Sequence, residues 1–133
     1  MSTTPKPTPS ELKILKFLWQ HGPSTVREVH EGIGVSAGHS YTTTLKQMQI
    51  MHGKSLLVRD DSQRAHVFQP AVGEEPTQRA MLDDFMDRVY EGSASQLVLQ
   101  ALGTSRPASS EELEAIEQLV QRLRSESDGE SEA

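Results

Sequence analysis

The order of two hydrophobic patterns constrains the fold of this chain most. As far as Gly53, apolar residues recur three or four positions apart in three successive stretches, which is the spacing of a helix face. Beyond Gly53 this spacing is lost, and residues 56–58 and 65–68 read as two short strands around a turn at residues 60–63. Three helices followed by a β-hairpin is the order of a winged helix-turn-helix.

Capping residues mark where the first helices begin. Thr8 and Glu11 have the spacing of a capping box with a proline between them, and Thr25 and Glu28 repeat that spacing. The third helix should begin after His39 or Ser40. We expect its buried side to consist of Thr44, Leu45, Met48 and Met51.

The third predicted helix starts with three threonines at residues 42–44, although branched side chains are poor helix formers. In a helix-turn-helix, the start of the second motif helix enters the major groove, where hydroxyls can contact base edges and phosphates. Thr43, Lys46 and Ile50 share one side of this helix, with Thr42 and Gln49 beside them. We interpret this side as the DNA reader, and a merely solvated polar surface is the alternative.

The predicted hairpin, or wing, adds positive charge near that helix. Arg59 and Arg64 flank its turn and are candidates for phosphate contacts, as is His66. We assign the following residues to DNA binding: Thr25, Tyr41, Thr42, Thr43, Lys46, Gln47, Gln49, Ile50, Lys54, Arg59, Arg64 and His66.

The second half of the chain is predicted to be helical. Residues 73–76 read as a linker between a DNA-binding domain at 1–73 and a helical dimerisation domain at 74–124, and residues 125–133 read as a disordered acidic tail. Short helices with this much apolar surface need a cover, and a second copy of the chain is the simplest one. The residues that we assign to the dimer interface are Phe85, Val89, Tyr90, Leu97, Val98, Leu102, Leu113, Ile116, Leu119 and Leu123.

Charge divides the chain in the same way. Residues 1–70 hold eight Lys and Arg against five Asp and Glu, a formal charge of +3, whereas residues 71–133 hold five against fourteen, a charge of −9. Only the first half is therefore suited to a polyanion such as DNA. Chance and an acidic tail are the alternative explanation of this gradient.

Several classes of function are disfavoured. The chain has no cysteine, and its five histidines lack metal-ligand spacing, so we expect no metal and no cofactor. Asp83, Asp84 and Asp87 read as a solvated helix surface rather than as catalytic carboxylates, and we expect no enzyme. No apolar run reaches the length of a membrane span, and the N-terminus lacks the apolar core of a signal peptide, so we expect a cytoplasmic protein.

Four motifs together resemble those of the penicillinase-repressor (BlaI/MecI) family of bacterial transcription regulators. They are TxxELxILxxLW at residues 8–19, TVREV at 25–29, YTTTLKxM at 41–48 and RAHVFxP at 64–70. YEGS at residues 90–93, with the apolar run after it, is similar to the family's dimerisation region. The resemblance implies a homodimeric repressor that binds an inverted-repeat DNA operator, often at genes of antibiotic or cell-wall stress.

The sequence departs from the family at three places. Ile50 stands where many members have arginine, and Lys54-Ser55 stands where many have Lys-Gly, so we expect a different turn into the hairpin. Gln100-Ala101 stands where a protease cuts an Asn-Phe bond in the antibiotic-inducible members. We therefore leave an inducing protease open as a partner.

The main hypothesis is a homodimeric DNA-binding repressor. The competing hypothesis is a winged-helix module that has lost DNA binding and holds a protein partner, which the net charge of −6 and the missing arginine at position 50 favour. Salt separates the two hypotheses, because phosphate contacts weaken steeply as salt rises, whereas an apolar interface does not.

Overall fold

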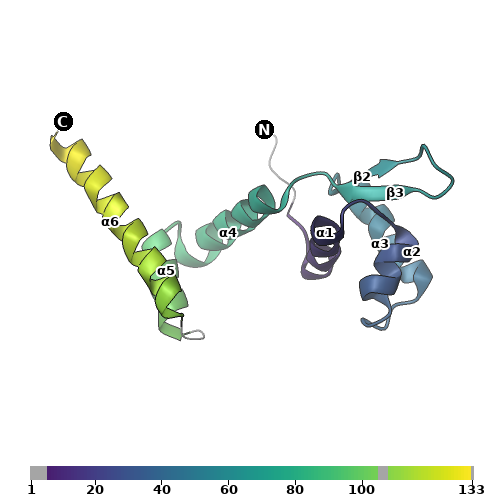
Figure 1. Ribbon diagram of the computed structural model, residues 1–133, viewed down its shortest axis with the longest axis horizontal. Coiled ribbons are helices and arrows are strands. Elements are labelled where there is room, and N and C mark those ends of the chain that lie inside the picture. Colours follow the sequence, from purple (N-terminus) through teal and green to yellow (C-terminus); the bar gives the residue numbers. More distant parts are fainter. Residues whose placement is uncertain (1–5, 105–107, 133) are drawn as a thin grey trace. The chain divides into compact units, whose positions relative to one another are not determined.

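The structure, a computed structural model, describes residues 6–104 and 108–132 (Figure 1). Its contacts divide the chain into two compact units, Met1–Arg88 and Val89–Ala133. The first unit thus extends beyond residue 73, where we expected the DNA-binding region to end. Within the described residues, all strands belong to this first unit.

The first unit begins with the predicted helices. They are α1 (Pro9–His21), α2 (Val26–Val29) and α3 (Tyr41–Gly53). A π-helical turn, η1 (His30–Gly34), continues α2 directly. The glycines at positions 32 and 34 lie inside this turn.

Side-chain caps fix the start of each of these helices. The Thr8 hydroxyl accepts the Glu11 N–H, and the Glu11 carboxylate accepts the Thr8 N–H at 2.9 Å. Thr25 and Glu28 form a second capping box in the same way. Ser40 caps α3 by accepting the Thr43 N–H at 3.2 Å. The predicted starting points are confirmed.

The hairpin consists of β2 (Leu57–Asp60) and β3 (Val67–Pro70), and a third strand, β1 (Ser24–Thr25), pairs with β3. All pairs are antiparallel in the order β1-β3-β2. Two residues are too few to show an alternating pattern, so β1 was not predictable. The turn between β2 and β3 also includes residues 65 and 66, which we had assigned to a strand.

One hydrophobic core joins the helices to the sheet. Its members come from α1, α2, α3 and the hairpin, and they are Ile14, Leu15, Leu18, Val26, Val29, Met48, Met51, Leu56, Leu57 and Phe68. Thr44, Met48 and Met51 are buried as predicted, and Leu45 is half-buried. Three helices packed on a small antiparallel sheet confirm the predicted winged helix-turn-helix.

The helix α4 (Glu74–Tyr90) follows the hairpin without the linker that we expected at residues 73–76. Its first turn is anchored: Thr77 is buried and its hydroxyl donates to the Gly73 carbonyl at 2.8 Å. Just before the helix, the Val72 carbonyl accepts the indole N–H of Trp19 at 3.2 Å. These contacts explain why most of α4 belongs to the first unit.

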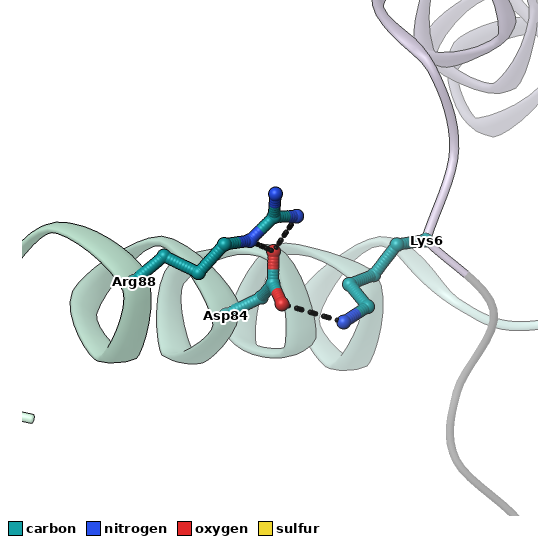
Figure 2. A network of polar contacts seen from close by, with 3 residues as sticks. All are labelled: Lys6, Asp84 and Arg88. Carbon is teal, nitrogen blue, oxygen red and sulfur yellow. Dashed lines mark hydrogen bonds and ion pairs between the residues drawn. The ribbon is translucent and has the colours of Figure 1, made fainter.

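An ion-pair network also holds α4 to the segment before α1 (Figure 2). The Asp84 carboxylate accepts Nζ of Lys6 at 2.7 Å and Nε of Arg88 at 3.0 Å. These hydrogen bonds, that of Arg88 first, lower the pKa of Asp84. Asp84 is thus a surface ion-pair partner.

The second unit contains α5 (Ala94–Thr104) and α6 (Ser110–Glu132). The N–H of Ser109 donates to the Glu112 carboxylate, and the N–H of Glu112 donates to the Ser109 hydroxyl, so Ser109 caps α6. The helix α6 continues through residues 125–132, where we expected disorder. Once a helix is formed, each further residue adds a backbone hydrogen bond, and acidic composition alone does not end it.

Candidate nucleic-acid interface

One side of α3 is free of contacts with the core. Thr42, Thr43, Lys46, Gln49 and Ile50 are exposed there, and we call these five residues the reading face. Gln47, also assigned to DNA binding, is half-buried at its border, and Tyr41 is exposed at the helix start. The helical spacing that predicted a shared side for Thr43, Lys46 and Ile50 therefore agrees with their exposure.

The hydroxyl groups at the start of α3 bond to one another. Oγ of Ser40 lies 3.0 Å from Oγ1 of Thr42 and 3.0 Å from Oγ1 of Thr43. These bonds, together with the Ser40 cap, offset the poor helix propensity of the threonines. The threonine run therefore serves the helix start as well as offering hydroxyls to a ligand.

Thr44 anchors α3 to the preceding π-helical turn. Its Oγ1 lies 3.0 Å from Nδ1 of His30, and the His30 ring meets the Tyr41 ring edge-on at 5.8 Å. A Cβ at Gly34 would lie 2.5 Å from Nδ1 of His30 and 2.7 Å from Oγ1 of Thr44, so only glycine fits between them. These contacts hold the start of α3 against η1.

A groove of about 420 Å³ separates the wing from α2 and α3. Its lining residues include six that we had assigned to DNA binding, namely Thr25, Tyr41, Gln49, Arg59, Arg64 and His66. Arg27 also lines the groove, and our sequence analysis missed it. The sequence could have indicated it, because Arg27 lies between Val26 and Val29, which are buried, and so belongs to the exposed side of α2.

The arginines around the groove differ in their partners. Nε of Arg59 lies 2.7 Å from the Asp61 carboxylate, and Nε2 of His66 lies 3.7 Å from the same carboxylate. Within the described residues, Arg27, Lys46 and Arg64 have no ion-pair partner. Three cations are therefore available to an anion here, whereas Arg59 is held by Asp61.

Lys54 is also held by a carboxylate. Its Nζ lies 2.8 Å from Oε2 of Glu11, which is buried at the start of α1. The structure therefore separates Lys54 from the other assigned DNA-binding residues, since its ammonium joins two helices of the domain.

The residues assigned to the dimer interface lie on α4, α5 and α6. Tyr90, Leu97 and Ile116 are half-buried, and the exposed ones are Phe85, Val89, Val98, Leu102, Leu113, Leu119 and Leu123. Leu82, Leu99 and Val120 are exposed as well, and we had not assigned them. Their apolar neighbours at helical spacing were the signal that could have identified them.

Two further searches concern only the part of the chain that the structure describes. No helix there is long and apolar enough to cross a membrane. No group of three or more His, Asp or Glu side chains there is placed to hold a metal ion.

The sequence profile described as penicillinase repressor matches residues 7–122. The chain belongs to the penicillinase repressor family. This is a family of transcription regulators, so the resemblance drawn from the four sequence motifs is confirmed.

Two curated members show how far this penicillinase repressor family protein resembles its relatives. It is 27% identical to the transcriptional regulator BlaI of Mycobacterium tuberculosis H37Rv over 90 residues, which span 67% of this chain and 65% of the relative. It is 23% identical to the penicillinase repressor of Bacillus licheniformis over 121 residues, 91% of this chain and 94% of that one. A solved MarR family protein from Bacillus stearothermophilus covers 92% of this chain and 76% of its own, with a TM-score of 0.47 and 19% identity.

Proposed function

We propose that this family member represses transcription by binding an inverted-repeat operator as a homodimer. One observation carries the proposal: the reading face presents Lys46 beside a groove lined by Arg27 and Arg64, and none of these three cations has an ion-pair partner among the described residues. Phosphate contacts of this kind supply affinity and fix the register of a protein on DNA, while the reading face supplies base contacts.

The size of α3 suits the major groove. Thirteen residues give a helix of about 20 Å, and the major groove is about 12 Å wide, enough to admit a helix. The wing would then approach the phosphates beside the groove through Arg64. A repressor of this kind acts by occupying promoter DNA, which requires it to reside with the DNA in the cytoplasm.

The second unit supports a homodimer. Residues 71–133, which include the second unit, carry a formal charge of −9 and are repelled by DNA, yet α5 and α6 expose several leucines and valines. A second copy would cover them and hold two reading faces about 34–36 Å apart, or a multiple of that distance, to match an inverted repeat. Specific binding by one winged helix alone would be weak, because its contact area is small.

The name of the Bacillus licheniformis relative, a penicillinase repressor, supports genes of antibiotic defence as targets. Induction by proteolysis is left out of the proposal, because residues 100 and 101 are Gln-Ala and not the Asn-Phe pair that the family's proteases cut.

The test is to capture genomic DNA fragments with the purified protein, sequence them, and measure affinity for the enriched site against salt. We expect an inverted repeat, and a plot of log K against log salt whose slope is about −0.9 per phosphate contacted. Sedimentation should show a dimer. If no fragment is enriched even at low salt, the proposal fails and a protein-binding module becomes the better explanation.

A further inference from the structure

Ile50 differs in chemistry from the rest of the reading face. The other four residues, Thr42, Thr43, Lys46 and Gln49, carry hydroxyl, ammonium or amide groups, whereas Ile50 is a hydrocarbon that is 47% exposed. It lies one helical turn beyond Lys46 and two turns beyond Thr43, so polar groups surround it on the helix surface. Packing in the hydrophobic core does not explain why an apolar side chain stands at this position, because Ile50 is not part of that core.

A hydrocarbon side chain at this position limits what it can read. It can neither donate nor accept a hydrogen bond, so it makes no favourable polar contact with phosphates or with the polar edges of bases. The apolar group that the major groove displays is the C5-methyl of thymine. We propose that Ile50 determines specificity by packing against a thymine methyl, which rests on the proposed DNA binding by α3.

Helix geometry places this contact relative to the others. Seven residues at 1.5 Å each separate Thr43 and Ile50 by about 10 Å along the axis of α3, which is about three base steps of 3.4 Å. A helical side chain leans towards the N-terminus of its helix, so that of Ile50 leans towards the turn of Lys46. The thymine should therefore lie at most about three base pairs from the position that Thr43 meets, because this limit is reached only when α3 runs parallel to the DNA axis.

Burial of the methyl sets the expected size of the effect. Removing one methyl group from an apolar contact lowers binding about fourfold, since about 0.8 kcal/mol is lost per buried CH₂ and 1.4 kcal/mol is a tenfold change. Replacing Ile50 by alanine should leave the fold intact, because the side chain is outside the core and alanine favours helix.

The experiment removes the contact once from the DNA, by taking away the thymine methyl, and once from the protein, by truncating Ile50. A duplex is selected from a random-sequence library by the intact protein, and each thymine is replaced in turn by deoxyuridine, which lacks only the methyl group. We expect one replacement per half-site to weaken wild-type binding about fourfold. Ile50→Ala should bind the selected duplex more weakly and should not distinguish thymine from deoxyuridine at that position.

Two matched variants control for unspecific loss. Val58→Ala removes an apolar side chain of the same 47% exposure from the wing and should keep the fourfold sensitivity. Thr43→Ser removes the methyl of the threonine that shares the side of α3 with Ile50, and it should keep the sensitivity too.

Three results would contradict the proposal. If no deoxyuridine replacement weakens wild-type binding, the proposed role of Ile50 is wrong although DNA binding stands. The same holds if Ile50→Ala still binds the deoxyuridine duplex more weakly than the thymine duplex. A sensitivity that disappears in Thr43→Ser instead assigns the methyl contact to Thr43. If the wild-type protein selects no duplex from the library, the proposed function itself has failed.

Discussion

The ammonium of Lys54 lies 2.8 Å from the carboxylate of Glu11, which is only 4% exposed. Burial by itself raises the pKa of Glu11, but the hydrogen bonds from Lys54 and Thr8 and the lysine charge outweigh it and hold this pKa below its ordinary value of 4.5. The pair ties the start of α1 to the residue that follows α3. It therefore helps to fix the reading helix in the domain.

Glu11→Gln should destabilise the protein at neutral pH. Loss of a charged hydrogen bond to a buried group costs about 1–3 kcal/mol. Because the folded-state pKa is lowered, the contribution of Glu11 is complete above pH 4.5 and is lost as the pH falls through the folded-state value. Urea unfolding from pH 7 to pH 3 should show the two proteins converging at acid pH.

Glu28→Gln is the matched control for this prediction. Glu28 fills the same capping-box position in α2, is exposed, and has no lysine partner among the described residues. The free energy of unfolding that Glu28→Gln loses should be smaller than that lost by Glu11→Gln, and less dependent on pH. Equal losses in both variants would show that capping, and not the pair with Lys54, accounts for the effect.

Ser55→Gly should stabilise the protein. Ser55 has φ +67, and its N–H and that of Leu56 close a Schellman motif on the carbonyls of His52 and Met51. A left-handed residue with a Cβ costs about 1–2 kcal/mol, partly offset by the greater freedom of glycine in the unfolded chain, so we expect a gain of about 0.5–1 kcal/mol. Chemical denaturation measures it.

The reverse substitution tests the same physics. Gly38 has φ +78 with open space around its Cα, so Gly38→Ala should lose stability through backbone strain alone. A Ser55→Gly variant that is no more stable than the wild type would show that the turn relaxes when the side chain is removed.

This turn also shows where the sequence was informative. Ser55, where the sequence led us to expect a different turn into the hairpin, adopts the left-handed conformation that glycine favours. Helix starts were predictable, since capping boxes are local in sequence. The ion pairs of Lys54 with Glu11 and of Lys6 with Asp84 join residues far apart in the chain, and no local pattern encodes them.

The reading face was predictable for a related reason. Helical spacing determines which residues share a side, so the exposure of Thr43, Lys46 and Ile50 followed from the pattern. Arg27 was missed because its role depends on how the wing folds back toward α2. The π-helical turn was missed as well, because it depends on the fit of Gly34 between His30 and Thr44.

Lys46→Ala and Thr43→Ala should impair operator binding with the circular dichroism spectrum unchanged. Loss of a phosphate contact by Lys46 should weaken binding to all sequences and reduce the salt slope by about one. Loss of a base contact by Thr43 should cost about 1–3 kcal/mol on the operator only. Lys16→Ala, which removes an exposed lysine of α1, should change neither quantity. Unaltered affinity in both variants would refute α3 as the reader.

Asp61→Asn should strengthen DNA binding. Its carboxylate holds Arg59 at 2.7 Å, so removing the charge frees a wing arginine for a phosphate and increases the salt slope. Asp60→Asn is the control, because it removes one negative charge at the neighbouring position. The Asp60 carboxylate accepts the Ser62 N–H and, among the described residues, does not pair with an arginine. Affinity should therefore rise more in Asp61→Asn. Equal gains would mean that only net charge near the DNA matters.

Leu102→Glu should dissociate the proposed dimer. Leu97, which we also assigned to the interface, is half-buried, so a charge there would also damage the fold of its own unit. Val98 and Leu102 are 45% and 46% exposed and lie one turn apart on α5, so a partner would bury both. A glutamate buried there without a partner costs several kcal/mol. Sedimentation should therefore show a folded monomer, and its DNA binding should be weak and salt-sensitive.

Gln96→Glu, which changes an exposed polar position of α5, should remain dimeric. A wild-type protein that is monomeric at micromolar concentration would contradict this role of the second unit.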